Sequence, residues 1–237
     1  MKSWQADLLN VAEGPGGAAA IFERVLAAAR GLGFDHCVYG VRIPLPLSAP
    51  RSVVLSNYPA AWQRRYHEAG YIETDPTVLH ARRSQDPLVW SEAVFDTAPV
   101  MWDEAQSFGL RHGWAKSTLN SNGVSGMLTV ARSHEALGAD ELARQDLKLR
   151  WLVSISHQAL SRELAPELTG LNRHTLTERE VEVLRWTADG KTSGEISDIL
   201  SISENTVNFH VKNAVAKLQV ANKTAAAVRA AMLGLLN

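Results

Sequence analysis

The chain has 237 residues, of which 46% are apolar and 21% charged, and its formal net charge is −1. These values are ordinary for a globular protein and exclude a largely disordered chain. The single cysteine, Cys37, excludes an intrachain disulfide and a thiolate metal cluster, and the eight histidines show no paired metal spacing. Neither a signal peptide nor a run of about 18 apolar residues is present, so we expect a soluble cytoplasmic protein.

The first two thirds of the chain alternate helical and strand patterns. Residues 18–33 have apolar positions at helical spacing and end in glycine, which predicts a helix and its stop. A longer pattern at 139–164 predicts one helix packed on a sheet. Short β-prone runs predict the strands, the last two joined as a hairpin: 36–43, 52–58, 87–90, 113–120 and 124–133.

Aromatic residues recur in the segment 55–79. Tyr58, Trp62 and Tyr66 stand at every fourth position, a spacing that places side chains on one face of a helix starting near Pro59. Asp75 follows, directly before a proline. The aromatic stripe is either core or the wall of a pocket. Asp75 is either a pocket carboxylate or a helix N-cap with Pro76 at the first helical position.

The sequence pattern changes around Pro166 and Gly170, where polar residues interrupt the apolar periodicity. We place a linker there, at 166–174, between a first domain at 1–165 and a second at 175–237.

The second domain divides into four short helices, predicted near 177–188, 193–200, 204–218 and 223–235. The segments "TERE" and "TSGE" fit capping boxes at the first two starts, and Ser203 and Asn222 are N-caps for the others. About three residues separate the second and third helices, as a helix-turn-helix requires.

The third of these helices has two chemically different faces. Asn205, Asn208 and Lys212 lie opposite a stripe that we expect to face the core, and no acidic residue follows Glu204. Asparagine amides and lysines suit base edges and phosphates, so we predict DNA binding rather than a merely solvated helix. The core stripe consists of Val207, Val211, Ala214, Val215 and Leu218.

The stretch "LTEREVEVLRWTADGKTSGEISDILSISENTVNFHVKNAVAKLQV" resembles the DNA-binding domain of LuxR-type regulators. The resemblance implies that Asn208, Phe209 and Lys212 read bases. Family members usually carry lysine or arginine at the position of Asn208, so the operator sequence of this chain should differ. By analogy the residues near phosphates are Lys191, Thr192, Asn205, Thr206 and Lys217.

The first domain resembles the autoinducer-binding domain of LuxR-type quorum-sensing receptors for N-acyl-homoserine lactones. The residues that carry this resemblance are Tyr58, Trp62, Tyr66, Asp75, Pro76, Trp90 and Gly113, together with "FGLRHGW" at 108–114. The implied fold is an α-β-α sandwich with a mainly antiparallel sheet, followed by an all-α four-helix helix-turn-helix domain. The motifs "LSNYP", "GLRHGW" and terminal "GLLN" are most similar to the branch that includes the quorum-sensing control repressor.

The chemistry of such a lactone agrees with the implied site. Asp75 would accept the amide N–H, Tyr58 would donate to the amide carbonyl, and the Trp62 indole would donate to the lactone carbonyl. Taken singly, Trp90, Trp102 and Met127 are better explained by core packing, and Thr129 can be an ordinary strand residue. The residues that would wall or line the pocket are Tyr66, Trp90, Trp102, Met127 and Thr129.

Other classes of protein fit the sequence less well. A phosphorylation-controlled receiver needs a doubly wound parallel sheet, and an enzyme using Asp75 or Glu73 would need a nucleophile and base that are not visible. A purely architectural DNA-binding protein would not need the aromatic-lined first domain. We therefore expect a transcription factor, not an enzyme, without cofactor or membrane contact. Its partners are an acyl-homoserine lactone, a second copy of the chain, promoter DNA and RNA polymerase; the alternative is a LuxR-type regulator that senses another small molecule or acts without ligand.

Overall fold

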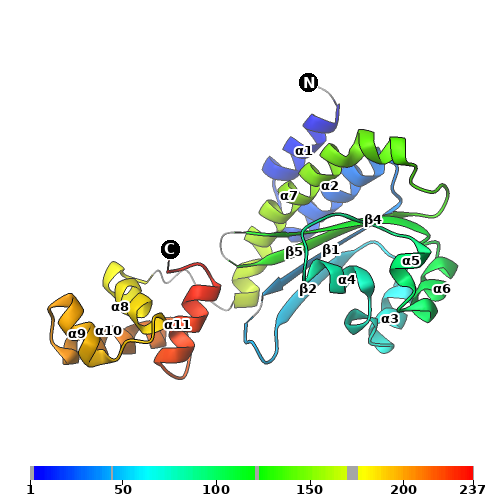
Figure 1. The fold of residues 1–237 in the computed structure, drawn as a ribbon. Helices are drawn as coiled ribbons and strands as arrows, with labels where there is room; N and C mark the ends of the chain where they lie inside the picture. Colours follow the sequence, from blue (N-terminus) through cyan, green and yellow to red (C-terminus); the bar gives the residue numbers. More distant parts are fainter. Residues whose placement is uncertain (1–2, 44, 121–122, 170–175, 237) are drawn as a thin grey trace. The chain divides into compact units, whose positions relative to one another are not determined.

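A computed structural model describes residues 3–43, 45–120, 123–169 and 176–236 (Figure 1). The chain divides into two compact units, and each has its own hydrophobic core. The first unit comprises residues 1–42, 52–119 and 125–165, and the second comprises residues 43–51, 120–124 and 166–237.

A five-stranded sheet forms the centre of the first unit, in the order β2-β1-β5-β4-β3. β1 pairs antiparallel with β5, β5 with β4, and β4 with β3. Every predicted strand forms, including the β4-β5 hairpin. The bounds are β1 His36–Ile43, β2 Arg51–Ser56, β3 Leu88–Val89, β4 His112–Leu119 and β5 Ser125–Arg132.

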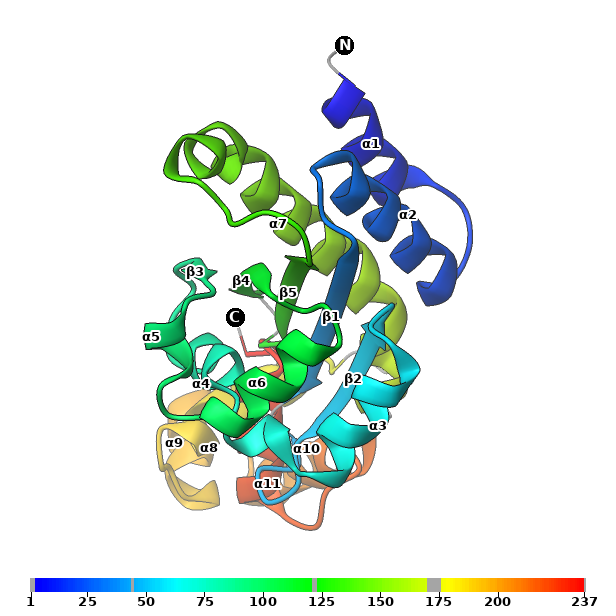
Figure 2. The same ribbon diagram turned by 90° about the vertical axis from the view of Figure 1, so that its right-hand side faces the viewer.

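Helices cover both faces of this sheet (Figures 1 and 2). One face carries α1 (Ser3–Glu13), α2 (Ala18–Gly31) and α7 (Ala139–Thr169). The opposite face carries α3 (Ala60–Glu68), the 3₁₀ turn η1 (Tyr71–Glu73), α4 (Pro76–Ala81), α5 (Glu92–Phe95) and α6 (Pro99–Ser107). Because both faces are covered, the central strand β5 is buried almost continuously from Leu128 to Arg132. The predicted α-β-α sandwich is confirmed.

Four helices differ from the sequence prediction. Neither α5 nor α6 was expected, since no helix was predicted between the strands at 87–90 and 113–120. No helix was expected at Ser3–Glu13, where the buried positions are Leu8 and Val11, too short a stripe to give a periodic signal. Helix α7 ends at Thr169, beyond the predicted end at Leu164 and inside the segment assigned to the linker. Residues 170–175 of that segment lie outside the described residues, so the linker and the domain boundaries remain predictions.

The second unit contains the four predicted helices, α8 (Glu178–Ala188), α9 (Ser193–Leu200), α10 (Glu204–Lys217) and α11 (Lys223–Met232). Both capping boxes form, Thr177 with Glu180 and Thr192 with Glu195. The side chains of Ser203 and Asn222 accept hydrogen bonds from the backbone N–H of the third helical residues, as predicted. Four local hydrogen-bonding motifs therefore fix where these helices begin.

The turn between α9 and α10 completes the helix-turn-helix. Ser201 adopts the left-handed conformation, with φ 53°, and ends α9, while Ile202 packs against the apolar side chains of the unit. The predicted apolar stripe of α10 faces inward: Val207, Ala214 and Leu218 are buried. Val211 and Val215 are partly buried against the same core. The predicted all-α fold is confirmed.

Candidate functional site

The sheet face under α3–α6 is lined by small residues. His36 on β1 pairs with Ala131 on β5, which pairs with Gly113 on β4. Residues directly opposite each other in a sheet share a face, so these three form one row. A Cβ added at Gly113 would overlap the indole of Trp90. Glycine is thus required here for that indole to lie against the strand.

An aromatic cluster packs on this row, between the sheet and the helices that cover it. Trp62 on α3 is only 3% exposed and stacks with Tyr71, the ring centroids 5.9 Å apart. On the other side Phe95 and Trp102 stack face to face at 4.2 Å, and Trp90 meets Trp102 edge to face. The predicted residues Trp62, Trp90 and Trp102 therefore belong to one cluster.

Asp75 is the buried carboxylate at the edge of this cluster. It is the N-cap of α4 with Pro76 at the first position: Oδ1 accepts hydrogen bonds from Thr77 N at 2.8 Å and Thr77 Oγ1 at 2.6 Å. Oδ2 accepts a hydrogen bond from the Tyr66 hydroxyl at 2.9 Å. Burial raises the pKa of Asp75, and the hydrogen bonds from Thr77 and Tyr66 oppose that rise. The capping role expected as an alternative is present, and Tyr66, predicted only as a wall, holds the carboxylate.

Tyr58 lies between β2 and α3, close to this carboxylate. Burial raises the pKa of the Tyr58 phenol, and the charge of Asp75 raises it further. The same two causes raise the pKa of Tyr66. Both phenols are therefore neutral at physiological pH, and that of Tyr66 donates to Asp75. The Tyr58 ring also meets the His36 ring edge to face, with centroids 5.8 Å apart.

Strand β5 contributes the two remaining predicted ligand residues. Thr129 pairs with Val38 and Met127 pairs with Gly40, so both side chains share the face of Ala131. Thr129 is buried and Met127 is partly buried. The structure thus brings all eight predicted ligand residues to one face of the sheet or to the helices that cover it.

Three buried nitrogen atoms on this face have no hydrogen-bond partner among the described residues: Trp90 Nε1, Trp102 Nε1 and His36 Nδ1. Buried polar groups in folded proteins are nearly always paired, and leaving one unpaired costs about 1–3 kcal/mol. These atoms are therefore available to a polar ligand. His36 was not among the predicted site residues, because a lone histidine in a strand gives no signal until the strand pairing is known.

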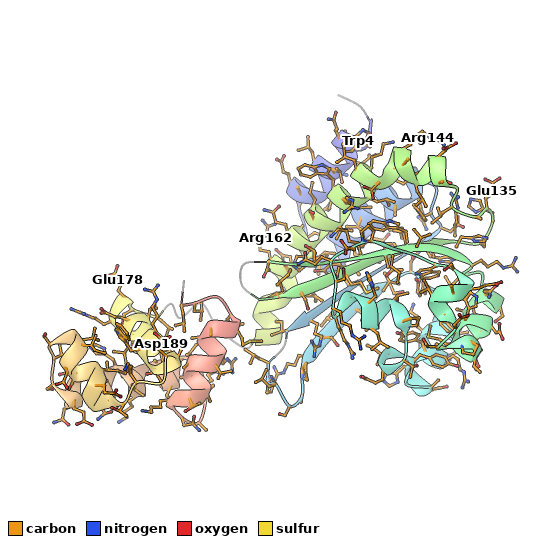
Figure 3. The ribbon with its side chains drawn as sticks, viewed as in Figure 1. Trp4, Glu135, Arg144, Arg162, Glu178 and Asp189 are labelled. Atoms are coloured by element: carbon orange, nitrogen blue, oxygen red, sulfur yellow. The ribbon has the colours of Figure 1, made fainter. Side chains whose placement is uncertain are left out.

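A different hollow lies on the other side of the sheet, where Trp4 on α1 and Arg144 on α7 are found (Figure 3). This open pocket of about 140 Å³ is bordered by α1, α2 and α7. Leu8 and Leu152 contribute to its walls, and Asp7 and Lys148 are its charged residues. The unpaired nitrogen atoms and the buried Asp75 carboxylate lie on the aromatic face and not at this pocket.

The predicted DNA-reading residues lie on the exposed side of α10. Asn205, Asn208, Phe209 and Lys212 are all exposed, and Phe209 exposes 60% of its surface. The amide oxygen of Asn208 accepts a hydrogen bond from the Ser193 hydroxyl on α9 at 2.8 Å. The sequence gave no reason to single out Ser193, since this contact depends on how α9 and α10 cross.

Several residues predicted near phosphates bind side chains of their own unit. Lys217 Nζ donates to Glu180 Oε2 at 2.7 Å, and Glu180 is only 3% exposed. Burial pushes the pKa of Glu180 up, but Lys217 and Thr177 outweigh it and the pKa is lowered. Lys217 therefore has a role in stability beside the predicted phosphate contact. The other pairs are Lys191 with Glu195, Thr192 with Glu195, and Thr206 with Ser203.

Two family models match the chain in this arrangement. Residues 17–160 match the autoinducer binding domain, and residues 174–230 match the bacterial regulatory proteins of the luxR family. The chain belongs to the LuxR family. It is a transcription regulator with an autoinducer-binding domain and a helix-turn-helix DNA-binding domain, and the family consists of regulators rather than enzymes. The receiver, enzyme and architectural alternatives are thereby excluded.

Relatives match this LuxR-family protein over its whole length. It is 45% identical over 239 residues to the transcriptional activator protein AnoR of Acinetobacter nosocomialis, covering 100% of both chains. The crystal structure of Escherichia coli SdiA superposes with a TM-score of 0.86 at 36% identity, covering 99% of this chain and 98% of that one. SdiA in complex with octanoyl-rac-glycerol gives a TM-score of 0.85 at 36% identity, covering 99% and 96%. The resemblance to the quorum-sensing control repressor branch remains a prediction.

Two further properties concern the described part of the LuxR-family chain. None of its helices there combines the length and apolar character needed to cross a membrane. No group of three or more His, Cys, Asp or Glu residues in those ranges could hold a metal ion.

Proposed function

We propose that this protein binds an N-acyl-homoserine lactone at the aromatic face of its sheet and acts on promoter DNA as a homodimer in the cytoplasm, together with RNA polymerase. The observation that carries the proposal is the buried Asp75 carboxylate, held by Tyr66 and Thr77 beside the Trp62 and Trp102 cluster. A carboxylate in such surroundings suits a ligand that brings its own N–H donor and an apolar body.

The hydrogen-bonding capacity of Asp75 leaves room for that donor. Each carboxylate oxygen can accept about two hydrogen bonds. Oδ1 already accepts two from Thr77, whereas Oδ2 accepts one from Tyr66. The remaining acceptor position on Oδ2 would take the amide N–H of the lactone. Tyr66 and Thr77 thus hold the Asp75 carboxylate in place and leave one acceptor position open on Oδ2.

Donors for the two carbonyl groups of the ligand come from the same region. The neutral Tyr58 phenol would donate to the amide carbonyl, and the indole N–H of Trp62 would donate to the ring carbonyl. Trp90 and Trp102 add two N–H groups that have no partner among the described residues. Thr129 would add a hydroxyl near the amide and Met127 an apolar contact.

The acyl chain would lie along the sheet. Gly40, Ala115 and Ala131 share the face of Met127 and Thr129 and carry little or no side chain there. Small residues on a sheet let an apolar chain approach the backbone. The complex of SdiA with octanoyl-rac-glycerol supports an acyl ligand for this fold, because octanoyl-rac-glycerol also joins an acyl chain to an oxygen-rich head.

DNA binding would use α10 of each subunit in the major groove. Asn208, Phe209 and Lys212 would reach base edges, and a dimer would place two such helices about 34–36 Å apart. The predicted phosphate contacts come from Lys191, Thr192, Asn205, Thr206 and Lys217. Bound lactone would stabilise the first unit by linkage and favour the dimer that engages both half-sites.

The test is to express the full chain with a panel of acyl-homoserine lactones, purify it, and identify the extracted small molecules by mass spectrometry. We expect one lactone class to be retained at about one molecule per subunit by the parent and lost from Asp75→Asn, which keeps the size of the side chain. Recovery of a different small molecule, or equal retention by both proteins, would contradict the proposal and favour the alternative regulator.

A further inference from the structure

The position of His36 on the first strand is unusual for a polar residue. Along β1, Cys37, Tyr39 and Val41 are buried on the side of α7, where the Tyr39 hydroxyl is 2.9 Å from His157 Nδ1. His36 points to the opposite face, in the row of Ala131 and Gly113. That row lies under the aromatic cluster, since Ala131 is a member of it. The imidazole is therefore placed on the ligand face.

Among the described residues, no polar atom pairs with the Nδ1 atom of the His36 imidazole. Nδ1 is buried, and the imidazole meets the Tyr58 phenol edge to face, with ring centroids 5.8 Å apart. A core residue in this position would ordinarily be apolar, because an unpaired buried nitrogen costs about 1–3 kcal/mol. A histidine here is explained if a ligand atom pairs with Nδ1.

Tyr58 indicates where the His36 imidazole lies relative to the proposed ligand. In the proposed function, on which this inference rests, Tyr58 donates to the amide carbonyl of the lactone. The His36 ring meets the same Tyr58 ring edge to face, which places the imidazole near the part of the ligand that carries the amide carbonyl. In 3-oxo and 3-hydroxy acyl-homoserine lactones, the carbon of the acyl chain nearest to that carbonyl that carries a further oxygen is C3.

We propose that His36 is a specificity-determining residue that hydrogen-bonds an oxygen on C3 of the acyl chain, so that the protein prefers 3-hydroxy or 3-oxo lactones over unsubstituted ones of equal length. A neutral imidazole can serve both substituents. In one tautomer Nδ1 accepts from a 3-hydroxyl, and in the other Nδ1–H donates to a 3-oxo group. An unsubstituted chain would leave Nδ1 buried and unpaired.

The test is isothermal titration of the full chain with three lactones of one chain length, unsubstituted, 3-oxo and 3-hydroxy. The parent should bind one or both substituted lactones roughly tenfold more tightly than the unsubstituted one. His36→Phe keeps an aromatic ring against Tyr58 but removes Nδ1, so it should bind all three about equally. His36→Gln retains a hydrogen-bonding group and should keep part of the preference, which also covers the case that the phenylalanine variant fails to fold.

The outcomes separate this inference from the proposed function. A parent that binds the lactones without preferring a substituted one, or a His36→Phe variant that weakens all three equally, would show His36 to be a packing residue while the lactone site stands. A parent that binds none of the three would overturn the proposed function and the role of His36 with it. Which substituted lactone loses most in His36→Phe identifies the substituent that His36 recognises.

Discussion

In the first unit, Trp90, Trp102 and His36 bury nitrogen atoms that have no partner among the described residues. In the second unit, most residues predicted to meet DNA are held by side chains of that unit, as Lys217 is by Glu180 and Asn208 by Ser193. A polar ligand on the first unit would supply hydrogen bonds to these nitrogen atoms, whereas most of the predicted DNA-binding residues of the second unit already have a side-chain partner. We therefore expect bound ligand to stabilise the first unit, and we expect the second unit to fold without ligand.

Separating the units gives the largest expected effect. A fragment starting near Arg173 should fold, because its four helices have their own caps and core. It should bind operator DNA without lactone but roughly 10²–10⁴-fold more weakly than the liganded full chain, since it loses the contacts that hold two recognition helices together. Circular dichroism and fluorescence anisotropy would measure both. An unfolded fragment, or one that binds DNA only when lactone is added, would contradict the expectation that the second unit folds and binds DNA without ligand.

The two roles of Asp75 can be separated by a pair of variants. Asp75→Asn keeps an amide oxygen for Thr77 and should leave thermal stability without lactone nearly unchanged, yet weaken lactone binding at least about tenfold, because one carboxylate oxygen is replaced by a donor. Asp75→Ala should lose the same affinity and, in addition, the helix cap, worth about 0.5–2 kcal/mol. Calorimetry and thermal unfolding measure the two effects. Parent-like lactone binding by Asp75→Asn would remove the carboxylate from the site.

The ion pair of Lys217 and Glu180 tests whether side chains of the second unit stabilise one another before DNA binds. Lys217→Met should lower the free energy of unfolding by about 1–3 kcal/mol at pH 7, because it leaves a buried carboxylate without its cation. The exposed pair of Arg179 and Glu182 supplies a matched control, and Glu182→Gln should cost only about 0.2–0.5 kcal/mol.

The same pair predicts a pH dependence. The folded-state pKa of Glu180 is lowered, so its stabilisation is complete above the ordinary glutamate pKa of 4.5 and is lost as the pH falls through the lowered value. The difference between the parent and Lys217→Met in urea unfolding should therefore shrink in acid. If Lys217→Met were as stable as the parent and only bound DNA less well, Lys217 would be a phosphate contact without a structural role.

Base reading by Asn208 should change the sequence preference of DNA binding and not the stability of the second unit. Asn208→Ala should relax the preference at one base pair per half-site by about 1–3 kcal/mol. Ser193→Ala removes the hydroxyl that holds the amide oxygen and should cause a weaker loss at the same base pair, about 0.5–1.5 kcal/mol. Binding to an operator and its single-base mutants over a salt series measures both. Identical base preferences in all three proteins would remove Asn208 from the reading residues and leave Ser193 as a surface contact.

Local features of the sequence determined most of the secondary structure. Thr177, Thr192, Ser203 and Asn222 each cap the helix that they were predicted to cap, since capping depends on residues only three positions apart. The strands followed from short runs of β-prone residues, and the inward stripe of α10 from a period of 3.6 residues. The sequence also predicted Trp62, Trp90 and Trp102, which the structure brings into one cluster, through spacing and family resemblance; their role in ligand binding stays a prediction.

Only the tertiary structure decided which polar atoms are paired. Tyr66 hydrogen-bonds Asp75 across a turn, Lys217 reaches Glu180 on another helix, and His36 lies in a row with Ala131 and Gly113 from other strands. The first relation depends on how the chain turns after α3. The other two depend on the packing of helices and on strand register, which bring together segments far apart in the chain. A sequence shows which groups can donate or accept hydrogen bonds, but burial and neighbours decide whether a group is satisfied within the protein or is left to bind a ligand.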